Sequence, residues 1–200
     1  MKNKILKVGI TGGIGSGKTT VCKIFETLGI PVYYADDRAK AIMVEDETLM
    51  NKVKQAFGDN AYLPDGTLNR AYISQIAFSN PLKLTELNAA VHPAILRDGE
   101  KWHNAQKDVP YTLKEAALLY ESGSDAVLDK IIMVYTPKNI RIERVLGRGG
   151  LTRDEIEARI AKQMPDEEKV KKADFIIYND GQKGLIAQVL EIHQSLSKPF

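Results

Sequence analysis

The chain has 200 residues, 44% of them hydrophobic, which is enough for one substantial core and a small additional subdomain. The chain has 28 Lys and Arg residues and 26 Asp and Glu residues, and this near balance argues against general electrostatic binding to nucleic acid or to an anionic membrane surface. The apolar stretches are too short to span a bilayer, and residues 1–10 lack the features of a signal peptide. With one cysteine, Cys22, and three histidines, the chain offers neither an internal disulfide nor a zinc-ligand set, so we expect a cytoplasmic location.

The N-terminal part of the chain predicts a strand–helix–strand unit. Residues 5–10 form a short apolar run that leads into a glycine-rich turn, and residues 18–28 have helical spacing. Gly29 ends that helix, and residues 31–34 are typical of a second strand. Such a unit implies a parallel pair of strands with a right-handed crossover.

A mostly helical block follows, from residue 36 to about residue 106. Helical periodicity or capping residues mark four segments, which are 36–44, 47–57, 69–78 and 81–107. Asn69 is suited to be an N-cap. Because this block is too long for a crossover helix, it predicts an inserted helical subdomain.

Alternating strands and helices return in the second half of the chain. Strand patterns cover residues 111–114, 130–135 and 173–178, and a closing amphipathic helix covers 185–196. A further helix begins at Pro137, and Thr152 with Glu155 forms a capping box that opens the next one. We therefore predict an α/β three-layer sandwich with a mostly parallel sheet.

A phosphate-binding loop is the most specific motif. Residues 12–19 fit G-x-x-x-x-G-K-[ST] between a strand and a helix, the context that disfavours an incidental glycine-rich turn. Glycines let backbone N–H groups surround an anion, and the helix N-terminus adds positive charge. Lys18 would reach the β- and γ-phosphates, and the Thr19 hydroxyl would bind Mg²⁺. The predicted nucleotide-binding residues are Gly13, Ile14, Gly15, Ser16, Gly17, Lys18, Thr19 and Thr20.

Switch GTPases share this loop, but their other motifs are missing from the sequence. Residues 51–54 begin with Asn-Lys but lack the final aspartate of the Asn-Lys-x-Asp motif that binds guanine. The Asp-x-x-Gly switch motif is also missing, because no aspartate is followed by glycine three residues later. A small-molecule kinase needs an acceptor pocket and a basic lid. Arg141, Arg144 and Arg148 have the spacing of one helix face just before a Gly-Gly pair, although each alone also suits a solvated charged face.

Two further residues carry alternative interpretations. Asp36 follows the second strand, where it could orient or deprotonate an attacking hydroxyl, hold Mg²⁺ through water, or cap the next helix. His92, in a His-Pro pair that interrupts a helical stretch, could contact an acidic ligand or be a packed histidine.

Taken together, the motifs resemble those of the dephospho-CoA kinase family over almost the whole chain. The matching elements are residues 8–20, Leu28-Gly29, Ala35-Asp36, Asp65-Gly66 with Leu68 and Arg70, residues 78–81, His92-Pro93, residues 118–121, Arg159-Ile160 with Gln163, Glu168-Lys169, Ala173-Asp174 and Asn179. The loop alone indicates only the P-loop superfamily, whereas this ordered set is far more specific.

The resemblance implies ATP-dependent phosphorylation of the ribose 3′-hydroxyl of dephospho-coenzyme A, with Mg²⁺. It implies that Lys18, Asp36 and Arg148 are catalytic, with Asp36 as the candidate base. It assigns the acceptor side to Asp36, Lys40, Arg70 and His92, and the ATP side also to Arg148 and Asn179. By the same analogy, residues 1–35, 108–136 and 169–200 form the nucleotide-binding core, 36–107 the acceptor-binding domain and 137–168 the lid.

Three positions depart from the family pattern. Tyr34 stands where the family often has an acid, Ala117 replaces a usual proline, and Lys40 replaces a common arginine and loses its bidentate fork. The alternatives are a nucleoside or nucleoside-monophosphate kinase and a non-catalytic ATP-binding module.

Overall fold

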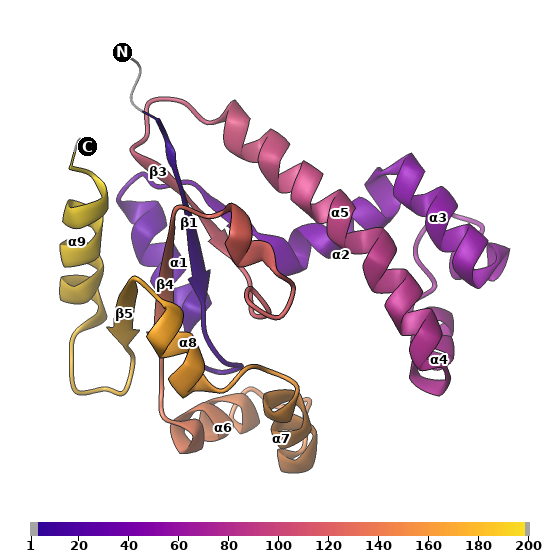
Figure 1. The fold of residues 1–200 in the computed structure, drawn as a ribbon. Helices are drawn as coiled ribbons and strands as arrows, with labels where there is room; N and C mark the ends of the chain where they lie inside the picture. Colours follow the sequence, from indigo (N-terminus) through magenta and orange to yellow (C-terminus); the bar gives the residue numbers. More distant parts are fainter. Residues whose placement is uncertain (1–3, 199–200) are drawn as a thin grey trace. The chain divides into compact units, whose positions relative to one another are not determined.

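The computed structural model describes residues 4–198 without the side chain of Phe78. Met1–Asn3, part of the segment in which we found no signal-peptide features, lie outside the described residues. The chain forms two compact units (Figure 1): unit 1 comprises residues 1–34 and 103–200, and unit 2 comprises residues 35–102. In the described part of the chain, no helix combines the length and the apolar character needed to cross a membrane.

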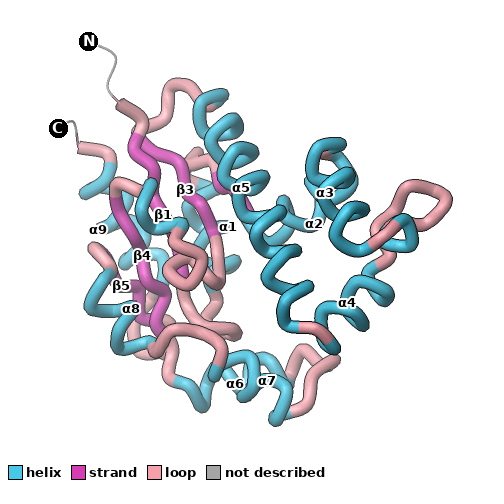
Figure 2. Tube along the Cα trace, turned by 45° about the vertical axis from the view of Figure 1, so that its right-hand side comes forward, coloured by secondary structure: helices cyan, strands magenta, loops and turns pink. Residues whose placement is uncertain are grey.

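A five-stranded sheet is the centre of unit 1 (Figure 2). The strands are β1 (Leu6–Thr11), β2 (Val32–Tyr34), β3 (Tyr111–Glu115), β4 (Lys130–Tyr135) and β5 (Phe175–Tyr178). They lie in the order β2-β3-β1-β4-β5, and every pair is parallel. The predicted parallel α/β sheet is therefore confirmed. Because parallel strands share one carboxyl edge, the residues that end β1, β2 and β3 meet there.

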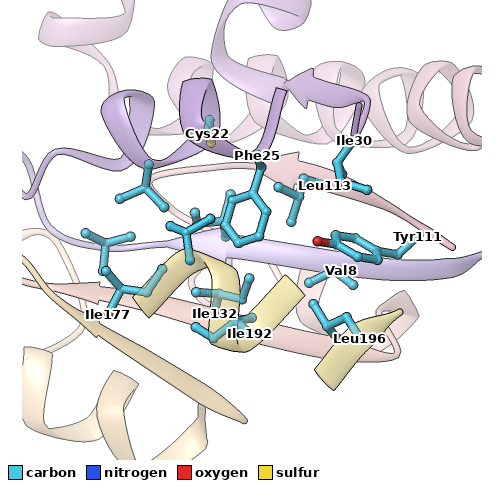
Figure 3. Packing of buried hydrophobic residues seen from close by; sticks show 14 residues of the cluster. Val8, Cys22, Phe25, Ile30, Tyr111, Leu113, Ile132, Ile177, Ile192 and Leu196 are labelled. Atoms are coloured by element: carbon cyan, nitrogen blue, oxygen red, sulfur yellow. The ribbon is translucent and has the colours of Figure 1, made fainter. Parts of the chain in front are cut away.

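Two helices, α1 (Lys18–Thr27) and α9 (Leu185–Leu196), cover one face of this sheet. Figure 3 shows their apolar side chains meeting those of the strands. The Phe25 and Tyr111 rings lie edge to face, with 6.3 Å between their centroids. On the opposite face, Leu119 and Leu128 fill the space beside Gly9, and α8 (Asp166–Lys172) lies against β4. The 3₁₀ turn η2 (Ser124–Val127) lies in the chain between Leu119 and Leu128.

In the segment that runs from α6 (Lys138–Leu146) through α7 (Arg153–Ala161) to α8, the first two helices form a small apolar core, against which Ile14 of the loop after β1 also packs. Thr152 and Glu155 form the predicted capping box at the start of α7, which is confirmed. The expectation of three arginines on one helix face is wrong. Because α6 ends at Leu146, Arg148 lies in the turn that follows it.

Unit 2 is helical. It contains α2 (Ala35–Glu45), α3 (Glu47–Phe57), the 3₁₀ turn η1 (Asp59–Ala61), α4 (Arg70–Ser79) and most of α5 (Pro81–Ala105). The predicted N-cap Asn69 accepts a hydrogen bond from the Tyr72 N–H, and is confirmed. The buried core of this unit includes Leu49, Val53 and Phe57, which lie on one side of α3.

Two expectations for unit 2 are wrong. Asp36 does not cap α2, because that helix begins one residue earlier, and Asp36 lies in its first turn. His92-Pro93 does not interrupt the helical stretch, because α5 continues through Pro93. The missing N–H of Pro93 removes one helix hydrogen bond, and packing of Ala94, which is 2% exposed, favours the continuous helix.

Candidate active site

The loop between β1 and α1 needs its glycines for two reasons. Gly15 and Gly17 have φ angles of 80° and 91°, which residues with a Cβ atom rarely adopt. A Cβ atom at Gly17 would also collide with the Asn179 side chain, and one at Gly13 with the Arg141 guanidinium. The backbone therefore curves tightly while other parts of unit 1 approach it closely.

Asn179, just beyond β5, supports the loop from the sheet side. Its Nδ2 donates to the Ser16 carbonyl oxygen at 2.8 Å, and the buried Thr136 hydroxyl lies 3.0 Å from that oxygen. The Asn179 carbonyl in turn accepts from Arg144 Nη2 at 3.0 Å. Asn179 and Thr136 thus fix the peptide that precedes Gly17 and the start of α1.

Arg141 is the second support, and it is 3% exposed. Its guanidinium pairs with Asp166 at 2.5 Å, donates to the Thr136 carbonyl at 3.1 Å, and lies 3.4 Å from the Ile14 carbonyl. This corrects the prediction that Arg141 belongs to an open, phosphate-binding arginine face. A buried guanidinium with these partners holds the loop instead.

Lys18 is the first residue of α1, and it is 9% exposed. Its Nζ donates to the Gly12 carbonyl at 3.0 Å and lies 3.8 Å from the carboxylate of Glu115. Glu115 ends β3 and is opposite Ile10 and Tyr34 in the register, so it occupies the carboxyl edge beside the loop.

Glu115 is a candidate site residue that the sequence interpretation missed, because the predicted strand stopped at Lys114. The available signal was an acid at the end of a buried strand, next to a phosphate loop. The Cys22 thiol nearby is fully buried in α1, and burial raises its pKa, so it remains protonated and packs as a small apolar group.

Comparison with known proteins decides among the enzymes that share such a loop. The family model described as dephospho-CoA kinase matches residues 6–184. The chain belongs to the dephospho-CoA kinase family. This confirms the resemblance inferred from the motifs and makes the chain an ATP-using phosphotransferase of the final step of coenzyme A synthesis.

Two dephospho-CoA kinases and two solved structures match this chain over nearly their full length. The Bacteroides fragilis enzyme is 35% identical over 94% of this chain and 91% of its own. The Chlorobaculum tepidum enzyme is 38% identical over 96% and 95%. The crystal structure of TT1252 from Thermus thermophilus, with 32% identity, has a TM-score of 0.83 over 96% of this chain and 97% of that one. A shikimate kinase from Bacteroides thetaiotaomicron, at 14% identity and a TM-score of 0.53 over 98% of this chain and 100% of that one, shares the fold alone.

The other residues predicted for this kinase fall in different places. Thr19 and Thr20 are exposed in the first turn of α1, and Arg148 is exposed in the turn after α6. Asp36, Lys40, Arg70 and His92 are exposed in unit 2, on α2, α4 and α5. Among the described residues, no hydrogen bond or ion pair joins any two of these four, and Lys40 pairs with Asp37 at 2.7 Å.

Proposed function

We propose that the loop and Lys18 bind the β- and γ-phosphates of ATP, and that Asp36 prepares the ribose 3′-hydroxyl of dephospho-CoA for attack. The observation that carries the proposal is the loop itself. Lys18 lies at the N-terminus of α1, and the loop backbone is held in shape by Asn179 and Arg141. Preorganised positive groups stabilise the charge that develops on a transferring phosphoryl group.

In this reaction the Asp36 carboxylate takes the proton of the 3′-hydroxyl as its oxygen bonds to the γ-phosphorus, and ADP leaves with the electrons of the broken P–O bond. Support for this role is that Asp36 is exposed, two residues beyond the end of β2. Lys40, Arg70 and His92 supply cationic or hydrogen-bonding groups for the acceptor.

The residues at the carboxyl edge also fit Mg²⁺, which prefers oxygen ligands and retains waters and phosphate oxygens. The Thr19 hydroxyl would hold the ion, with the Glu115 carboxylate as a second oxygen donor. When bound, the ion would neutralise phosphate charge.

In the same proposal, unit 2 binds the acceptor, residues 137–168 form the lid that carries Arg148, and Asn179 lies near ATP. The chain works in the cytoplasm on small molecules. The family and the near balance of 28 basic and 26 acidic residues support that location and substrate class.

The acceptor preference tests the reaction. With ATP and Mg²⁺, we expect ADP formation to depend on dephospho-CoA and to yield coenzyme A, measured by a coupled assay and mass spectrometry. AMP, nucleosides and shikimate serve as comparison acceptors. Robust turnover of AMP or a nucleoside without turnover of dephospho-CoA would favour the nucleotide-kinase alternative. Tight ATP binding without any productive acceptor would favour a binding module.

Arg148→Ala tests the lid. We expect strongly reduced turnover and an almost unchanged melting temperature, because ion pairs of an exposed arginine contribute only about 0–1 kcal/mol. Arg153→Ala is the matched control, since Arg153 is exposed in the same segment and pairs with Glu143 at 2.7 Å. A large drop in melting temperature with intact activity per folded molecule would make Arg148 a structural residue.

A further inference from the structure

Ile14 of the phosphate loop contacts the α6–α8 segment through its side chain, its carbonyl oxygen and its N–H group. Its side chain packs with the apolar cluster of α6 and α7. Its carbonyl oxygen lies 3.4 Å from Arg141 Nη1, and its N–H donates to Gln163 Oε1 at 3.1 Å. Gln163, in the connection between α7 and α8, therefore touches the phosphate loop directly.

The orientation of the Gln163 carboxamide follows from this contact. Because the Ile14 N–H is a donor, the atom that faces it must be the amide oxygen. Nε2, bonded to the same carbon, keeps two N–H donors, for which residues 4–198 provide no acceptor. A half-buried amide with its acceptor engaged and its donors unused, beside an anion-binding loop, is suited to bind a phosphate oxygen.

One hydrogen bond and two ion pairs hold the backbone around Gln163 in place. The Met164 N–H donates to Glu121 Oε1 at 2.7 Å, and the fully buried Lys169 ammonium pairs with the same oxygen at 2.9 Å. Burial opposes ionisation of Glu121, but these hydrogen bonds hold its pKa below its ordinary value. Asp166 pairs with Arg141, so residues on the C-terminal side of Gln163 are fixed to the body of unit 1.

We propose that Gln163 binds the γ-phosphate of ATP. Oε1 remains on the Ile14 N–H, and Nε2 donates to an oxygen of the transferring phosphoryl group. This inference rests on the proposed function only in taking ATP as the nucleotide. A neutral donor on these oxygens stabilises the charge they carry while the phosphoryl group moves between ADP and the acceptor.

Gln163→Glu and Gln163→Ala test this role through the affinities for ADP and for a non-hydrolysable ATP analogue, measured by calorimetry without acceptor. Glu keeps an oxygen for the Ile14 N–H but replaces Nε2 by a second oxygen, which repels a phosphate. We expect an analogue affinity about tenfold to a hundredfold lower in Gln163→Glu, with ADP affinity nearly unchanged. In Gln163→Ala we expect the loss for the analogue to exceed that for ADP.

A purely structural role of Gln163 predicts a different pattern of affinities. Gln163→Ala would then weaken ADP and the analogue equally, and Gln163→Glu would leave both unchanged, which would overturn the proposal. Gln163→Glu retains the contact that shapes the loop, so it is the variant to interpret if Gln163→Ala does not fold. Gln194→Glu on the exposed side of α9 adds the same charge as a matched control, and we expect wild-type affinities for it.

Wild-type turnover of dephospho-CoA, measured in parallel, separates the two proposals. In one outcome, the wild type does not use this acceptor, but Gln163→Glu still lowers the affinity for the analogue more than the affinity for ADP. The assigned reaction then fails, and the γ-phosphate contact stands. If the wild type is active and each variant changes the affinities for ADP and for the analogue by the same factor, the Gln163 proposal alone is wrong.

Discussion

Lys18→Ala is expected to lower turnover by about a hundredfold or more, because in the proposed function it removes the preorganised positive charge that binds the β- and γ-phosphates. The structure adds an effect on stability. Lys18 is buried 3.8 Å from Glu115, so the substitution removes a cationic partner of a buried carboxylate. We expect the free energy of unfolding to fall by up to about 3 kcal/mol, measured by thermal and chemical denaturation.

Two further variants separate catalysis from stability at this position. Lys18→Ala combined with Glu115→Gln is expected to regain much of the lost stability without regaining activity, because no buried charge is then left behind. Lys23→Ala, an exposed lysine of the same helix, is expected to change neither. Near-normal turnover in folded Lys18→Ala would contradict the role assigned to Lys18.

Asp36→Asn is expected to give a folded, ATP-binding protein whose turnover falls by roughly tenfold to a hundredfold. Asparagine is nearly isosteric but cannot accept the proton of the ribose hydroxyl. A positioned base contributes about 10²–10⁴-fold, and phosphoryl transfer with a loose transition state demands the low end of that range. Because Asp36 is exposed in the first turn of α2, loss of its charge lowers stability by only about 0.3–1 kcal/mol.

Glu47→Gln is the matched control, since it removes an exposed acid from the first turn of α3 in the same unit. It is expected to have the same small effect on melting temperature and no effect on turnover. Steady-state kinetics with saturating ATP and dephospho-CoA is the measurement. Wild-type turnover in Asp36→Asn would leave Asp36 with a role at the helix terminus only.

Local features of this protein were predictable from sequence because their causes lie within a few residues. The capping box at Thr152 and the N-cap at Asn69 each join residues three apart, and both are present. The phosphate loop is likewise set by the spacing of its glycines and Lys18 between a strand and a helix. Boundaries decided by packing were less predictable, such as the start of α2 at Ala35 and the continuation of α5 through Pro93.

The sequence by itself determined the parallel α/β class, the phosphate loop and, through the ordered motifs, the family. Only the tertiary structure decided how that loop is held. Asn179 supports Ser16 across 163 positions of the chain, and Gln163 reaches Ile14 across 149. Arg141 has the spacing of a solvated arginine but is buried against Asp166, and Glu115 becomes part of the site through its place in the sheet. Such contacts join segments whose local patterns are independent, so no local pattern predicts them; they arise when the sheet and the helices that cover it bury their apolar faces together.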